Sequence, residues 1–139
     1  MIKTIFFTLF ITFLRSFSTN NENVEELNLQ LDRLILPEGF KIEVYASDIE
    51  NARSMAISPS GTVFVGNRRA DNVFALKDTD GDNKIDKKYL ITDKLKNMPN
   101  GVAYFNGDLY VAEVNKIWVF KNIEENLTKR CTQEFFFFC

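Results

Sequence analysis

Short apolar runs separated by turn residues are the feature that most constrains how this chain can fold. From residue 36 onward, runs rich in Val, Ile, Phe and Tyr alternate with clusters of Gly, Pro, Asn and Asp, which is the pattern of strands joined by turns. Segments 58–61 and 105–108 have the composition of tight turns and join their neighbouring runs as hairpins. The pattern predicts an all-β fold with strands at 41–45, 54–58, 62–66, 72–76, 88–95, 101–105, 108–112 and 116–120.

The later strands repeat the earlier ones. A period in the forties with four strands per unit is typical of a β-propeller blade. A plain meander, or a sandwich with two similar hairpins, is the alternative. The matching positions are Ala56 with Ala103, 47 residues apart; Val63 with Leu109 and Val65 with Val111, each 46 apart; and Val73 with Ile117, 44 apart.

Counting strands gives about one and three-quarter four-stranded antiparallel blades of a partial β-propeller. Segment 54–95 makes one complete blade, segment 101–120 makes three strands of a second, and segment 41–45 would close the last blade of the ring. Propellers have roughly four to eight blades, and each blade buries its faces only against its neighbours. We therefore expect residues 36–127 to be the first blades of a larger ring, with apolar faces that need neighbours.

The beginning of the chain has the features of a secretory signal peptide. Lys3 precedes the apolar segment Ile5–Leu14, and Ser16–Ser18 offers small residues for cleavage. The apolar segment is shorter than the roughly 20 residues that a membrane-spanning helix needs. We expect residues 1–18 to be removed and the protein to be exported, periplasmic or secreted, with no membrane attachment afterwards. An uncleaved anchor is the alternative.

Two further segments lie outside the strand pattern. Residues 19–35 are expected to form a linker with a short helix, because Leu27, Leu31 and Leu34 have helical spacing. Residues 128–139 are expected to be an aberrant tail, frameshifted or disordered, because four consecutive phenylalanines beside a free cysteine favour aggregation. A hydrophobic tail that docks on a partner is the alternative.

The composition excludes several classes of protein. The chain contains no histidine, which excludes Ser-His-Asp and Cys-His nucleophiles and histidine-containing metal sites. Its two cysteines, Cys131 and Cys139, lie at the end of the chain and offer no disulfide framework. With 17 Lys+Arg against 19 Asp+Glu, the net charge of -2 argues against a nucleic-acid-binding protein.

An acidic segment at residues 78–86 has the spacing of a calcium-binding loop. Carboxylates at loop positions 1, 3, 5 and 9, with a backbone carbonyl at position 7, supply the hard oxygen ligands that calcium prefers. Gly81 and Asn83 provide the backbone freedom for a sharp turn. A solvated acidic turn without an ion is the alternative, and we expect any bound calcium to be structural. The predicted ligands are Asp78, Asp80, Asp82, Lys84 and Asp86.

Blade topology predicts which loops share a rim. The connections at 48–53, 67–71, 96–100 and 113–115 would lie on one rim, over the central channel where propellers bind ligands, and the acidic loop would lie on the other. Arg53 and Asn100 come just before innermost strands and are the candidate cofactor contacts. The other polar residues of this rim are Arg68, Arg69 and Glu113.

Four segments together resemble the start of the glucose/sorbosone dehydrogenase family: Leu36–Ala46, Asn51–Arg68, Val73–Asp86 and Met98–Ile117. The resemblance implies an exported, six-bladed propeller that oxidises a sugar or sugar aldehyde with pyrroloquinoline quinone (PQQ) and calcium. In the family a histidine acts as general base, and side chains of Arg, Lys and amide residues hold the cofactor. The turn that contains Asn100 corresponds to a family segment near the cofactor.

This chain departs from the family because it has no histidine. We therefore expect an inactive N-terminal part of a quinone-dependent sugar dehydrogenase, with no catalytic residue and without PQQ bound by this part alone. A calcium-stabilised, propeller-like binding module that assembles with other chains is one alternative. A lactonase-type propeller hydrolase, in which Glu113 would help to hold a metal, is the other.

Overall fold

A computed structural model describes residues 31–128 and 133–137 of the chain. The chain divides into two units, residues 1–41 and residues 42–139, which are treated separately. In the first unit, the described part contains one short 3-10 helix, η1 (Leu31–Arg33), followed by irregular chain. The expected signal peptide, and most of the expected linker helix, lie outside the described residues.

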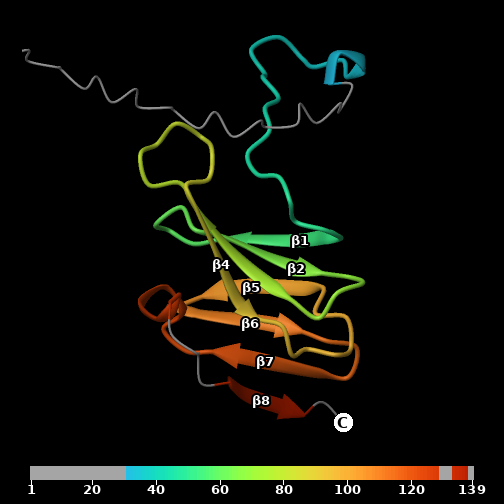
Figure 1. The fold of residues 1–139 in the computed structure, drawn as a ribbon, viewed down its shortest axis with the longest axis vertical. Coiled ribbons are helices and arrows are strands. Elements are labelled where there is room, and N and C mark those ends of the chain that lie inside the picture. The colour runs from blue at the N-terminus through green and yellow to red at the C-terminus, as the bar shows by residue number, and fades with distance from the viewer. Residues whose placement is uncertain (1–30, 129–132, 138–139) are drawn as a thin grey trace, which may run out of the picture. The chain divides into compact units, whose positions relative to one another are not determined.

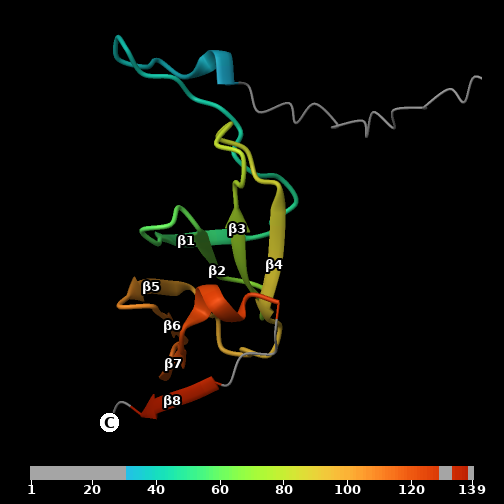
Figure 2. The same ribbon diagram turned by 90° about the vertical axis from the view of Figure 1, so that its left-hand side faces the viewer.

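The second unit consists of two four-stranded antiparallel sheets, which confirms the all-β prediction (Figures 1 and 2). The first sheet has the order β1 (Ala52–Ile57), β2 (Val63–Asn67), β3 (Val73–Lys77), β4 (Lys87–Thr92). The second has the order β5 (Gly101–Phe105), β6 (Asp108–Ala112), β7 (Lys116–Phe120), β8 (Gln133–Phe137), with the 3-10 helix η2 (Ile123–Asn126) between its last two strands. Within residues 31–128 and 133–137, no helix has the length and apolar character needed to cross a membrane.

The two sheets repeat each other row by row. Residues that pair across β1, β2 and β3 correspond to residues that pair across β5, β6 and β7, with offsets of 47, 46 and 44. These are the offsets that the sequence predicts. The matching rows are Met55–Val65–Phe74 with Val102–Val111–Trp118, Ala56–Phe64–Ala75 with Ala103–Tyr110–Val119, and Ile57–Val63–Leu76 with Tyr104–Leu109–Phe120.

The sheets pack through opposite faces of the repeated unit. Side chains of neighbouring rows point to opposite sides of a sheet. We call the face with the row Ala56–Phe64–Ala75 in the first sheet, and Ala103–Tyr110–Val119 in the second, the leading face. The opposite face, with the other two rows, is the trailing face. The leading face of the first sheet packs on the trailing face of the second, where the ring of Phe64 stacks on that of Tyr104 with centroids 5.7 Å apart. The fully buried members of this core are Phe64, Val73, Ala75, Ile91, Leu95, Leu109, Val111, Phe120 and Ile123.

One predicted strand is wrong. Residues 41–45 are irregular, and the side chains of Ile42 and Val44 lie 41% and 38% exposed. A strand needs a neighbour to accept and donate its backbone hydrogen bonds, and the described residues place none along this segment. The alternating apolar residues of 41–45 therefore pair with no described strand.

The second sheet has a fourth strand that the sequence analysis did not predict. Residues 133–137, in the segment expected to be an aberrant tail, form β8 and pair with β7. Phenylalanine favours strands, and the free edge of β7 offers unpaired backbone groups. The hypothesis of a frameshift stays a prediction about the gene.

Candidate functional site

Three of the four loops that the sequence assigns to one rim, 67–71, 96–100 and 113–115, line a pocket of about 280 Å³, and the loop at 48–53 does not. The β2–β3 loop, the β4–β5 connection, the start of β5 and the β6–β7 turn each supply part of its wall. The lining residues are Arg68, Met98, Asn100, Gly101, Ala112, Glu113 and Val114.

Backbone hydrogen bonds hold the β4–β5 connection against both sheets. The N–H of Asn67 donates to the carbonyl of Pro99 at 2.9 Å, and the N–H of Val114 donates to the carbonyl of Asn97 at 3.0 Å. The approach to β2 is possible because residue 66 is glycine: a Cβ there would lie 2.5 Å from the Asn100 carbonyl oxygen. The position of Asn100 in the pocket is therefore fixed by Gly66.

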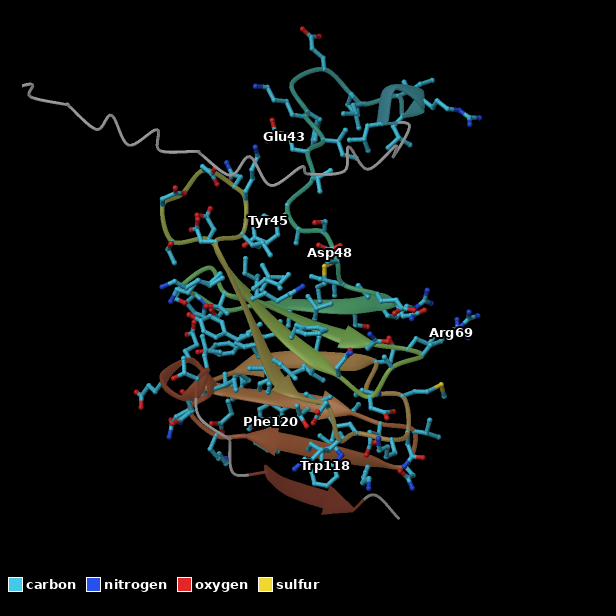
Figure 3. The ribbon with its side chains drawn as sticks, in the orientation of Figure 1. Glu43, Tyr45, Asp48, Arg69, Trp118 and Phe120 are labelled. Carbon is cyan, nitrogen blue, oxygen red and sulfur yellow. The ribbon has the colours of Figure 1, made fainter. Side chains whose placement is uncertain are left out.

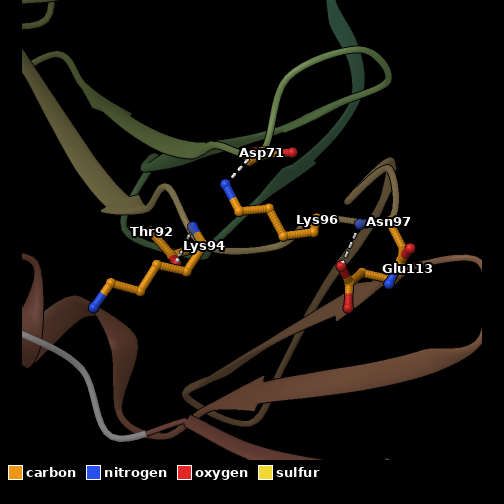
Figure 4. A network of polar contacts seen from close by, with 6 residues as sticks. All are labelled: Asp71, Thr92, Lys94, Lys96, Asn97 and Glu113. Atoms are coloured by element: carbon orange, nitrogen blue, oxygen red, sulfur yellow. Dashed lines mark hydrogen bonds and ion pairs between the residues drawn. The ribbon is translucent and has the colours of Figure 1, made fainter.

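Glu113 fastens the same connection with its side chain, which is 1% exposed. Its Oε1 accepts a hydrogen bond from the backbone N–H of Asn97 at 2.7 Å, as Figure 4 shows. Its Oε2 accepts one from Nε1 of Trp118 at 2.6 Å and lies 3.5 Å from Nζ of Lys116. The Lys116 ammonium also lies 4.8 Å from the centre of the Trp118 ring. The carboxylate is thus fully engaged in positioning the loop.

A second buried side chain shapes the β2–β3 loop. Asn67, which is 1% exposed, accepts hydrogen bonds through Oδ1 from the N–H groups of Arg69 and Ala70 at 3.0 and 2.8 Å. Its Nδ2 donates to the carbonyl of Glu50 at 2.6 Å. This turn sets the direction of Arg68 at the pocket. Asparagine is a common turn former at the end of a strand, and this signal in the sequence could have indicated its role.

The predicted rim residues separate into two groups. Asn100 and Arg68 line the pocket, and Oδ1 of Asn100 lies 3.4 Å from the Ser54 hydroxyl, which donates to it. Arg53 is exposed on β1 and Arg69 is exposed on the β2–β3 loop, and neither lines the pocket. Figure 3 shows Arg69 at the outer edge of this loop. Of the two predicted cofactor contacts, the structure therefore places Asn100 at the pocket and Arg53 away from it.

The acidic β3–β4 loop brings together three of its four aspartates. Carboxylate oxygens of Asp78, Asp80 and Asp86 lie within 4.8 Å of one another. Asp78 also organises the turn, because its carboxylate accepts hydrogen bonds from the N–H groups of Gly81 and Asn83 at 2.6 and 3.0 Å. Both of these residues have positive φ, of 83° and 67°, as the sequence predicts for the sharp turn.

The remaining predicted ligands lie differently. Asp82 is not part of this group of three, and its carboxylate accepts a hydrogen bond from the N–H of Lys84 at 2.8 Å. Thr79 orients Asp86: its hydroxyl and its N–H both donate to Asp86 Oδ2 at 2.6 Å, and these bonds lower the pKa of the Asp86 carboxyl. The loop therefore holds three carboxylates close together, while Asp78 and Asp86 also accept hydrogen bonds from the loop itself.

The segment before β1 runs beside this loop. The N–H of Ile85 donates to the carbonyl of Tyr45 at 3.1 Å, and Figure 3 shows the Tyr45 side chain next to the loop. Burial, and then the negative charge of Asp78, raise the pKa of the Tyr45 phenol. The hydrogen bond from Ile85 thus ties the β3–β4 loop to the segment that leads into β1.

A carboxylate that the sequence analysis did not single out ties the sheets together at the β1–β2 turn. Glu124, on η2, accepts hydrogen bonds from the hydroxyls of Ser58 and Thr62 at 2.9 and 2.8 Å, from that of Ser60, and from the Tyr104 phenol at 3.1 Å. Burial raises the pKa of Glu124, but the four hydroxyl hydrogen bonds outweigh it and the net pKa is lowered. All four donors use this one carboxylate, which indicates a structural role.

Comparison with known proteins assigns the chain to a family. The family described as a domain of unknown function (DUF7133) matches residues 26–130. The chain belongs to this family. The match includes both β1–β4 and β5–β7 and ends before β8, so the repeated strands of both sheets lie in one family domain.

A protein of Borreliella burgdorferi, described as uncharacterized, is 32% identical to the chain over 97 residues. These residues are 69% of this chain and 24% of that protein, so the chain spans about a quarter of its relative's length. No solved structure matches the chain.

Proposed function

We propose that this DUF7133 chain supplies the first two blades of an exported PQQ-dependent sugar dehydrogenase of the glucose/sorbosone type. In this proposal each four-stranded sheet is one blade of a propeller, and the pocket beside Arg68 and Asn100 is the part of the cofactor site that this chain contributes. The observation that carries the proposal is that loops from both sheets, separated by up to about 46 residues, meet at one pocket on the predicted rim.

The lining of the pocket fits one anionic group of a cofactor. The guanidinium of Arg68 can donate two parallel hydrogen bonds to a carboxylate, and the Asn100 amide can donate a third. PQQ carries carboxylates and, when bound, supplies the hydride acceptor. The chain has no histidine to act as base, so it would hold the cofactor while residues outside this chain move the proton.

The geometry favours this function over a lactonase-type hydrolase. In the hydrolase alternative, Glu113 would have to offer a carboxylate oxygen to a metal in the pocket. Both of its oxygens instead accept short hydrogen bonds from Asn97 and Trp118. Glu113 is therefore better suited to position the β4–β5 connection than to bind a metal.

The test uses the chain extended by the downstream coding sequence in the neighbouring reading frame. With PQQ and calcium present, we expect dye-linked oxidation of glucose or sorbosone by the extended protein and none by the 139-residue chain. Arg68→Ala should raise the PQQ concentration for half-maximal activity about tenfold or more, because a charge-assisted hydrogen bond contributes about 1.5–3 kcal/mol. Arg69→Ala, on the same loop but outside the pocket, is the matched control. A folded extended protein that oxidises none of these sugars would overturn the proposal.

We also propose that the acidic loop binds calcium as a structural ion. Asp78, Asp80 and Asp86 already lie close enough to share one cation, and a cation would relieve the repulsion among them. The loop holds the segment before β1 through Ile85, so an ion there would stabilise the entry into the first blade. Asp82 and the carbonyl of Lys84 would complete the ligand set after a small rearrangement.

Thermal unfolding tests the calcium proposal. Calcium at 100 times its Kd should stabilise the chain by about 2.7 kcal/mol, a rise in Tm of about 10 °C or more for a unit of this size. Asp78→Asn should abolish the rise, whereas Asp93→Asn, an exposed aspartate outside the loop, should leave it unchanged. An unchanged Tm at millimolar calcium would show that the loop is a solvated acidic turn.

A further inference from the structure

Each sheet has one face that no other sheet covers among the described residues. The trailing face of the first sheet carries Met55 and Ile57 on β1, which are 69% and 67% exposed. The leading face of the second sheet carries Ala103 and Phe105 on β5, and Phe105 is 71% exposed. Large apolar side chains with this exposure at neighbouring positions on a strand are typical of an interaction surface.

The exposed residues lie on the strands that make the contact between the two sheets. In that contact, β5 of the second sheet packs beside β1 and β2 of the first. The segment before β1 runs along the β4 part of the trailing face of the first sheet, where the N–H of Ile85 donates to the carbonyl of Tyr45 and the Lys88 ammonium donates to that of Asp48, both at 3.1 Å. The β1 part of the trailing face stays exposed.

The row correspondence identifies what fits each exposed face. Within one copy, the leading face of the first sheet packs on the trailing face of the second. Because the two sheets have matching rows, the leading face of the second sheet should fit the trailing face of the first sheet in the same way. Tyr110 on the second sheet corresponds to Phe64, and Ile57 on the first corresponds to Tyr104. Stacking the second sheet of one copy on the first sheet of another would therefore repeat the Phe64–Tyr104 contact as a Tyr110–Ile57 contact.

We propose that a second copy of this chain docks head to tail, with the leading face of its second sheet on the trailing face of the first sheet of its neighbour. The two surfaces differ, so the contact is heterologous and continues until the ring closes. Two sheets per chain and four to eight blades per propeller correspond to rings of two to four copies. This proposal concerns the 139-residue chain: in the longer protein of the proposed function, further blades of the same protein would cover these faces, so the two proposals are tested on different proteins.

The test uses two variants of the full chain that each block one face. Met55→Lys places a charge on the trailing face, and Phe105→Lys places one on the leading face. Both side chains are mostly exposed within one copy, so we expect each variant to fold with nearly unchanged stability. In sedimentation velocity, the wild-type chain should form a discrete oligomer, and each variant alone should be a monomer.

Mixing the two variants distinguishes the possible contacts. The intact leading face of Met55→Lys should bind the intact trailing face of Phe105→Lys, which gives a 1:1 heterodimer that grows no further. Lys121→Ala, a change at an exposed residue outside both apolar patches, serves as the control and should keep the wild-type oligomer. A monomeric wild-type chain, or a variant that still self-associates through one blocked face, would overturn the head-to-tail contact.

Discussion

Gly66 is the residue at which the backbone of the first sheet comes closest to the β4–β5 connection. A Cβ at this position would lie 2.5 Å from the carbonyl oxygen of Asn100 and 2.7 Å from that of Pro99. Both are backbone atoms, and the Pro99 carbonyl accepts the hydrogen bond from the N–H of Asn67, so they cannot move aside as a flexible side chain could. The shape of the rim pocket therefore depends on the absence of a side chain at residue 66.

Gly66→Ala should destabilise the chain by about 1–3 kcal/mol, because an added methyl group forces the connection away from β2. Urea denaturation measures this difference. Gly101→Ala is the graded comparison: its Cβ would meet only the Ala112 side chain, at 3.2 Å, and the loss should be smaller. Equal losses in the two variants would contradict this account of Gly66.

Glu124 makes part of the stability depend on pH. The pKa of its carboxyl is lowered in the folded chain, so its contribution is present above the unfolded pKa of about 4.3 and is lost as the pH falls through the folded pKa. Glu124→Gln should therefore be less stable than the wild type at pH 7, and the gap should shrink as the pH falls below the unfolded pKa. Denaturation curves at several pH values test this. A gap of the same size at pH 7 and pH 3 would show that the charge of Glu124 does not matter.

At the scale of elements, β1 to β7 and the hairpin turns of the β1–β2 and β5–β6 pairs were predictable, whereas β8 and the irregular 41–45 segment were not. Strand positions follow from local alternation, and the offsets between Ala56 and Ala103 or Val65 and Val111 survive because both sheets use the same pairing rows. The irregular 41–45 segment could not be predicted, because pairing depends on a distant strand. The roles of Glu113 and Glu124 also could not be predicted, since Glu113 reaches a donor 16 residues away and Glu124 reaches hydroxyls more than 60 residues away.

The connection between the sheets should be sensitive to Glu113. Glu113→Ala removes the acceptor of the Asn97 N–H and the Trp118 Nε1–H, which should cost about 1–3 kcal/mol. Glu113→Gln keeps one acceptor oxygen and should lose less. Guanidinium denaturation measures both, with Glu125→Gln, at an exposed residue of η2, as a control that should change little. If Glu113→Ala were as stable as the control, the carboxylate would not fasten the connection.

At the scale of the whole molecule, two equivalent sheets stacked in the same sense leave the β1 part of one trailing face and the β5 part of one leading face exposed. Proteins built from stacked repeats need end repeats with polar outer faces to stay soluble, and the exposed Phe105 and Met55 show that this chain has apolar ends instead. The pocket on the rim is likewise formed by two sheets only, whereas a propeller gathers its ligand site from the whole ring. Both features are explained if the sheets are consecutive blades that require neighbours.

Photochemical cross-linking tests this central claim most directly. A photoreactive benzoylphenylalanine in place of Phe105 would lie on the leading face of β5, and mass spectrometry would identify the residue that it captures. The account predicts capture of β1 of another copy, at or beside Met55 and Ile57. Capture of β5 of another copy, or of no second copy at concentrations where the chain is folded, would contradict it.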